Sequence, residues 1–254
     1  MTTPRVPTSL KPYPGGGIAS SGQSAAGPLP QPDSGNPQLQ ASPRFLSNGQ
    51  ACSNYVPAHV QYGRFLQSRL GRNDEAMKQM AYAAELDPSD HAIRAMVGLV
   101  TYAARQYDSA ISQFKEVNAA YPGMGDFGLS LCYREKKMYP EPIAALERVA
   151  VVDSLHRPTI LSSLAAVYGL AGGKREALKL IDELKEKSRQ HYIPASLFAE
   201  AYMGVSEDEA MNWLERAYEE HDQWMVYINS YPGYDALRSD PRFQALVRRM
   251  NFPQ

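Results

Sequence analysis

The chain has 254 residues, of which 44% are apolar, enough for one large domain or two small ones with a core of ordinary size. Its formal net charge of −1 provides no long-range field that would favour nucleic acid, an anionic membrane surface or acidic ligands. Cys52 and Cys132 stand far apart and form no CxxC pattern, so we expect two reduced thiols.

Residues 1–44 are predicted to be a disordered arm. They hold nine of the 19 prolines and six of the 18 glycines, and such a segment buries too little apolar surface to offset its backbone entropy. The arm has no apolar core typical of a secretory signal, and its PRVP run is interpreted as linker rather than as a polyproline ligand. Residues 45–56 are an ambiguous lead-in.

From residue 57 onward the pattern predicts helices and no sheet, because apolar residues recur every three or four positions. The longest apolar stretch, between Arg94 and Arg105, is too short to span a bilayer, so we expect a cytoplasmic protein without a membrane span.

The helical part repeats with a period near 34 residues. Each copy has a small residue or proline, a bulky apolar residue four positions later, and an apolar or small residue three positions after that. The five anchor sets are Ala76/Met80/Ala83, Ala110/Phe114/Val117, Pro142/Leu146/Val149, Ala177/Ile181/Leu184 and Ala210/Leu214/Ala217. This regularity predicts five stacked helix pairs.

A small residue precedes four of the anchor sets, where two helices must approach closely. These residues are Gly98, Ser130, Ala165 and Ala199. Arg64 stands at the corresponding place in the first repeat, so we expect that helix pair to pack loosely or to act as a cap. Pro88 and Pro122 close the first two repeats, as a helix end requires.

The pattern resembles the tetratricopeptide repeat. The resemblance implies an all-α fold, a right-handed superhelix of about five antiparallel helix pairs with a C-terminal capping helix. The expected boundaries are 57–88, 91–122, 123–154, 158–189 and 191–222 for the repeats and 223–254 for the cap. The last three repeats lack the closing proline.

The last third resembles a narrower group, the C-terminal arm of bacterial winged-helix transcription regulators and receptor-type serine/threonine kinases. The runs that carry this resemblance are LSSLAAVYGLAGGKREALKLIDELKEKSRQHYIP, DEAMNWLERAYEEHDQWMVYI and LRSDPRFQALVRRMNF. No winged helix or kinase motif precedes the repeats, so the signalling output of those proteins does not carry over.

The end of the chain predicts the cap in detail. Asp240 can cap a helix that begins at Pro241. Four apolar residues then fall on one helix face: Phe243, Leu246, Val247 and Met250.

No motif predicts catalysis, a cofactor or a metal site. The glycine run at 15–17 lacks the Lys-Ser/Thr of a phosphate loop, no GxSxG elbow is present, and the five histidines stand alone. Trp213 and Trp224 are interpreted as packing residues. We therefore expect a protein without enzymatic activity.

The resemblance implies that the first helix of each pair lines a concave surface. The inward residues expected there, an apolar groove for a protein or peptide partner, are Phe65, Leu99, Tyr102, Phe127 and Leu131, with Arg69 and Arg134 as inward cations. The alternative is that these residues only pack between neighbouring helices. The sequence thus predicts an interaction scaffold or, as the second hypothesis, a regulatory arm separated from its effector.

Overall fold

The computed structural model describes residues 54–121, 123–152 and 157–252. The arm 1–44 and almost all of the lead-in 45–56 lie outside these residues, so their predicted character stays a prediction. Where the chain is described it is helical and has no strand, which confirms the all-α expectation.

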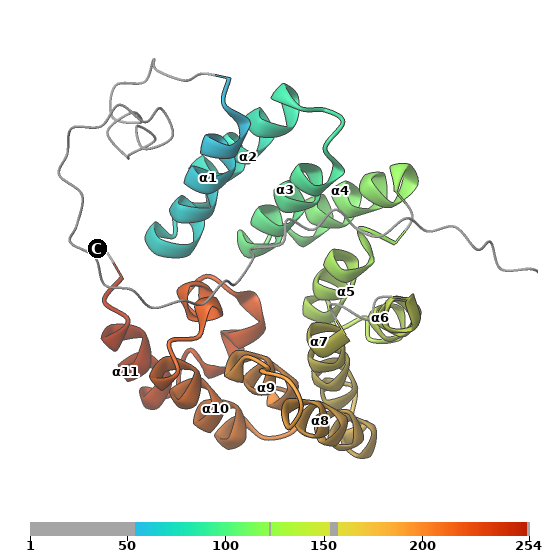
Figure 1. Ribbon diagram of the computed structural model, residues 1–254, viewed down its shortest axis with the longest axis vertical. Coiled ribbons are helices and arrows are strands. Elements are labelled where there is room, and N and C mark those ends of the chain that lie inside the picture. Colours follow the sequence, from blue (N-terminus) through green and yellow to red (C-terminus); the bar gives the residue numbers. More distant parts are fainter. Residues whose placement is uncertain (1–53, 122, 153–156, 253–254) are drawn as a thin grey trace, which may run out of the picture. The chain divides into compact units, whose positions relative to one another are not determined.

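Ten of the α-helices follow one another as five pairs, and an eleventh closes the described chain (Figure 1). The pairs are α1 (Val56–Leu70) with α2 (Asn73–Leu86), α3 (His91–Ala103) with α4 (Tyr107–Ala120), α5 (Asp126–Glu135) with α6 (Pro140–Val152), α7 (Arg157–Leu170) with α8 (Lys174–Ser188), and α9 (Ala195–Tyr202) with α10 (Glu207–Glu219). Two short 3₁₀ helices, η3 (Gln223–Tyr227) and η4 (Pro232–Leu237), come before α11 (Pro241–Arg249).

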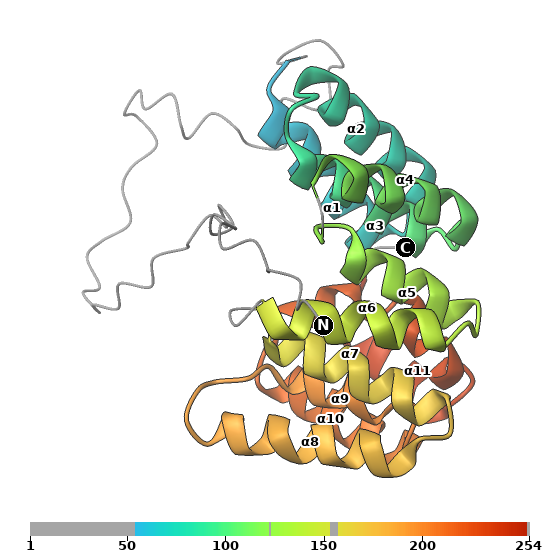
Figure 2. The ribbon, with the colours of Figure 1, turned by 90° about the vertical axis from the view of Figure 1, so that its right-hand side faces the viewer.

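The helices stack in the manner of a solenoid. The two helices of each pair pack on each other, and the second helix of each pair packs on the first helix of the next (Figure 2). The first helices also contact one another in succession from α1 to α9. They therefore form an inner layer, and α2, α4, α6, α8 and α10 form an outer one.

The anchor residues of the repeat make up the core between the two layers. All five first members and all five bulky second members of the anchor sets are buried. Val149 in the third set is only half-buried, and the other third members are buried. Pro142 lies in the first turn of α6, where its missing N–H costs no hydrogen bond. The repeat period read from the sequence is therefore the period of the packing.

The helices of the second pair approach closely at Gly98. A Cβ atom there would lie 2.7 Å from Cε1 and Cζ of Phe114, so only glycine leaves room for this ring. The first pair uses the same arrangement, since Gly63 faces Met80 at the equivalent place. The expectation of loose packing at Arg64 is thus wrong. The small residue sits one position earlier, and Arg64 is exposed.

Replacing Gly98 by Leu is expected to lower the free energy of unfolding by about 1–3 kcal/mol, because the side chain must displace Phe114. Helix propensity acts in the opposite direction by about 1 kcal/mol. Urea denaturation followed by circular dichroism measures the difference. Arg94→Leu, at an exposed position of the same helix, is the control and should change stability by less than about 0.5 kcal/mol. A more stable Gly98→Leu protein would contradict the packing.

The C-terminal helix covers the last repeat as predicted. The Asp240 carboxylate accepts a hydrogen bond from the Arg242 N–H at 2.7 Å and caps α11. Phe243 and Leu246 are buried in the cluster formed by α9 and α10, and Val247 and Met250 pack against the same cluster half-buried. η3 and η4, which lie between α10 and α11, fall within the predicted cap 223–254 and were not expected from the sequence.

Candidate functional site: a pocket beneath the η3–η4 segment

The residues from Gln223 to Leu237, named here the η3–η4 segment, lie against the inner helices (Figure 1). η3 packs on α1, and Arg64 Nη2 donates a hydrogen bond to the Tyr227 hydroxyl at 3.0 Å. Arg105, in the turn that follows α3, forms an ion pair of 2.7 Å with Asp235. The segment therefore joins the last repeat to the first two.

The start of the segment is fixed by a buried carboxylate. Asp222 accepts hydrogen bonds from the backbone N–H groups of Trp224 and Ser196, both at 2.9 Å. One of these bonds caps η3 and the other holds the first turn of α9. The direction in which the chain leaves α10 is thus set by hydrogen bonds rather than by apolar packing alone.

A pocket of about 410 Å³ lies between the segment and the inner helices, with walls mainly from α1, α3, α5 and α9. This volume is in the range of small-molecule sites. The wall is mostly apolar. Its aromatic residues are Tyr102, Phe127, Trp224, Tyr227, Tyr231 and Tyr234.

The structure brings four of the predicted groove residues together at this pocket: Leu99, Tyr102, Phe127 and Leu131. Phe65 is not part of the pocket wall and is exposed on α1. Arg69 is half-buried and lies over the ring of Phe252, with 5.9 Å between Cζ and the ring centroid.

The expectation of an open groove is wrong at three of these residues. Tyr102, Leu131 and Arg134 are only 2%, 3% and 4% exposed. The η3–η4 segment supplies Tyr231, which packs near Tyr102 with 6.1 Å between ring centroids and bonds to Arg134. Leu99 remains 37% exposed, and Trp224, at 48%, is more open than its interpretation as a packing residue implied. Trp213 does pack, stacked on Phe198 with 4.3 Å between ring centroids.

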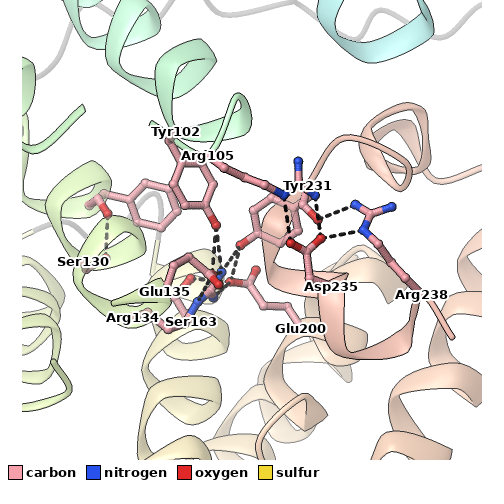
Figure 3. Close-up of polar contacts among 11 residues, drawn as sticks. Tyr102, Arg105, Ser130, Arg134, Glu135, Ser163, Glu200, Tyr231, Asp235 and Arg238 are labelled. Atoms are coloured by element: carbon pink, nitrogen blue, oxygen red, sulfur yellow. Dashed lines mark hydrogen bonds and ion pairs between the residues drawn. The ribbon is translucent and has the colours of Figure 1, made fainter. Parts of the chain in front are cut away.

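Arg134 is the centre of a buried polar network beside the pocket (Figure 3). Its Nη1 bonds to Glu200 Oε1 at 3.0 Å, and its Nη2 lies 2.9 Å from Glu135 Oε1. The same Nη2 donates to the hydroxyls of Tyr102 and Tyr231, both at 3.1 Å. Burial is expected to be costly for this cation, and the two carboxylates compensate for it.

Glu200 collects hydrogen bonds from three parts of the chain. Its Oε1 accepts from Arg134, from Ser163 Oγ at 2.9 Å and from the Tyr231 hydroxyl at 2.9 Å. Burial raises the pKa of Tyr231 and of Tyr102, so both phenols keep their protons at neutral pH and can donate. The network therefore fastens α3, α5, α7, α9 and the η3–η4 segment to one another.

Glu200 and Ser196 were missed from the sequence. Both lie on α9, in the run ASLFAEAY, where a single carboxylate stands in an otherwise uncharged helix. That carboxylate was the available signal, since a buried Glu needs partners from elsewhere in the chain. Ser196 Oγ is buried without a hydrogen-bond partner in the described structure, and its residue lines the pocket.

Cys132 on α5 is buried, and burial raises the pKa of its thiol to about 12. The thiol should therefore stay protonated and unreactive at pH 8. In a Cys52→Ser variant, so that Cys132 is the sole cysteine, we expect modification by a chromogenic disulfide reagent to be at least about a hundredfold slower in the native protein than in urea. Equal rates in the two states would contradict this burial.

Solved structures with a similar fold include TTC0263 and PilW. The tetratricopeptide repeat protein TTC0263 of Thermus thermophilus is 20% identical, with a TM-score of 0.53 over 70% of this chain and 98% of its own. PilW, a type IV pilus biogenesis factor, is 15% identical, with a TM-score of 0.52 over 83% of this chain and 89% of its own. Comparison with protein-family models and with curated proteins gives no match.

The likeness to TTC0263 together with the paired helices shows that this chain has the tetratricopeptide-type solenoid fold. Among the described helices, none has the length and apolar character needed to cross a membrane.

Proposed function

We propose that this tetratricopeptide-type solenoid is a non-enzymatic scaffold that binds a protein or peptide partner at its inner face, in the cytoplasm of a bacterial cell. The observation that carries the proposal is the group of apolar side chains left exposed on that face. Leu99 and Trp224 belong to the pocket wall and are both exposed, and Phe127 beside them is half-buried. Exposed apolar residues around a concavity are typical of protein interaction sites.

The proposed partner surface is narrower than the groove expected from the sequence. Because Tyr102, Leu131 and Arg134 are buried, a partner would contact Leu99, Phe127 and Trp224 at the pocket opening. An apolar segment of the partner fits this surface best, since Arg64 and Glu200 are the only charged side chains among the described residues of the wall.

A photo-reactive phenylalanine analogue in place of Leu99 tests the proposal in the native cell. We expect it to crosslink a defined protein that an identical probe at Leu178 does not. Leu178 is the matched control because it is equally exposed, at 39%, but lies on the outer helix α8. The captured protein is then purified and its affinity for the chain is measured directly.

Leu99→Lys should weaken that affinity at least about tenfold without changing the melting temperature, because an exposed lysine keeps its ammonium group in water. Leu178→Lys should leave the affinity unchanged. Equal crosslinking at the two positions, or full affinity in Leu99→Lys, would refute a partner site at the pocket opening.

A regulatory arm separated from its effector is the second candidate function, and the pocket is the observation that favours it. A sensor needs a place for its signal molecule, whereas a simple scaffold does not. A winged-helix or kinase gene next to this one, whose product binds the chain, would support this alternative over the first.

A further inference from the structure

The wall of the pocket is rich in aromatic rings. Aromatic rings follow one another along its wall, with 5.9 Å between the centroids of Trp224 and Tyr227 and 5.3 Å between those of Tyr231 and Tyr234. The faces of such rings are electronegative and attract cations as well as apolar groups.

The buried acidic and basic side chains next to these rings are unequal in number. Among the described residues, Arg134 is the one cation paired with Glu135 and Glu200, so these three side chains together hold one carboxylate more than they hold cations. Glu200 is also a residue of the pocket wall. Arg64 is the opposing charge of that wall, but it is exposed, where water and salt screen it.

The Ser196 hydroxyl is a further buried polar group of the pocket wall. Ser196 Oγ makes no hydrogen bond to the described residues although Ser196 is only 6% exposed. An unpaired buried hydroxyl costs free energy that a ligand with a donor or acceptor could recover.

These features exclude several ligand classes. A carboxylate or phosphate would be repelled by Glu200 and by the negative excess behind it. Metal binding lacks support, because in the part of the chain that the structure describes no three His, Cys, Asp or Glu side chains gather as ligands. A wholly apolar molecule would leave Ser196 Oγ unpaired.

We infer that the pocket is a binding site for a small organic amine, whose protonated nitrogen lies toward Glu200 and whose apolar body packs against the aromatic wall. The carboxylate supplies charge, the rings supply cation–π attraction and apolar contact, and Ser196 Oγ supplies one further hydrogen bond. This site does not depend on the proposed scaffold function, because a free amine can occupy the pocket whether or not a protein binds at the opening.

Isothermal titration calorimetry with three probes of similar size tests the inference on the full chain. The probes are 2-phenylethylamine, the neutral 2-phenylethanol and the anionic 3-phenylpropionate. The amine is expected to bind with a Kd of about 1 mM or below, at least about tenfold tighter than the alcohol, and the carboxylate should not bind measurably. No binding of the amine, or equal binding of amine and carboxylate, overturns the inference.

Two substitutions with opposite expected effects on amine affinity locate the site. Glu200→Gln keeps a side chain that can form hydrogen bonds but removes the charge, and should weaken amine binding at least about tenfold. Arg64→Gln removes the opposing cation of the wall and should tighten amine binding about two- to fivefold. Amine binding that is unchanged in both variants would place the amine elsewhere and overturn the inference.

A pocket-filling variant keeps the test decisive if Glu200→Gln does not fold. Leu99→Trp enlarges an exposed residue of the wall and should abolish amine binding without touching the polar network, whereas Leu178→Trp on α8 should leave it unchanged. Full amine affinity in Leu99→Trp would overturn the inference. Partner crosslinking at position 99 is a separate measurement, so either proposal can fail while the other holds.

Discussion

Replacing Arg134 by Met is expected to lower the free energy of unfolding by about 3–5 kcal/mol, the largest effect of any single substitution proposed for this chain. The guanidinium is 4% exposed and is the only cation within hydrogen-bond distance of Glu200 in the described structure. Without it, Glu135 and Glu200 are left as two carboxylates beside each other with no buried cation between them. Methionine fills a similar volume, so the loss reports the charge rather than a cavity.

The matched control is Arg216→Met, which removes an exposed ion pair to Glu220, four residues on, and a cation–π contact of 4.9 Å with the Trp213 ring. Such a pair contributes only about 0.3–0.5 kcal/mol, so this variant should melt close to the parent protein. Adding Glu200→Gln to Arg134→Met should recover part of the lost stability, because it removes one of the stranded charges. If Arg134→Met and Arg216→Met are equally stable in urea denaturation, the network contributes nothing to the fold.

The periodic part of this fold could be predicted from the sequence because each helix pair is a local unit. Ala110, Phe114 and Val117 lie on one helix face, and Gly98, which leaves room for the Phe114 ring, lies in the helix just before. The first repeat has one residue more than the second between its small residue and its anchor set. The same reasoning therefore selected Arg64, although Gly63 is the residue at which the two helices approach closely.

The pocket could not be predicted in this way because its walls meet through contacts between distant residues. Tyr231 reaches Arg134 across 97 positions, and Tyr227 reaches Arg64 across 163. The η3–η4 segment has no helical period, so the repeat pattern ends before it and gives no information about where it packs. Four of the expected inward residues line the pocket, but the η3–η4 segment that covers them was not foreseen.

Ending the chain after Ser239 is the second large perturbation that the structure predicts. The truncation removes α11 and with it Phe243 and Leu246, both buried in the cluster of α9 and α10. Single replacements of such residues by alanine cost about 2–5 kcal/mol each, so losing both should lower the free energy of unfolding by about 5 kcal/mol or more. The exposed apolar surface on α10 should also promote association, since terminal repeats of a solenoid need a polar outer face.

The expected truncated protein keeps most of its helical signal, because the five helix pairs lie N-terminal to the cut, but it elutes as oligomers in size-exclusion chromatography with light scattering. The control retains the helix and removes contacts that two of its arginines make at the surface, including the ion pair of Arg242 with Asp240 and the cation–π contact of Arg249 with the Tyr218 ring. Arg242→Ala with Arg249→Ala breaks the contacts to Asp208 and Glu215, which are exposed and should cost about 1 kcal/mol or less together. Because the control keeps Phe243 and Leu246, any difference between the two proteins measures apolar coverage of the last repeat. A truncated chain that is monomeric and as stable as the control would mean that α11 is an appendage and that the last repeat closes the solenoid without it.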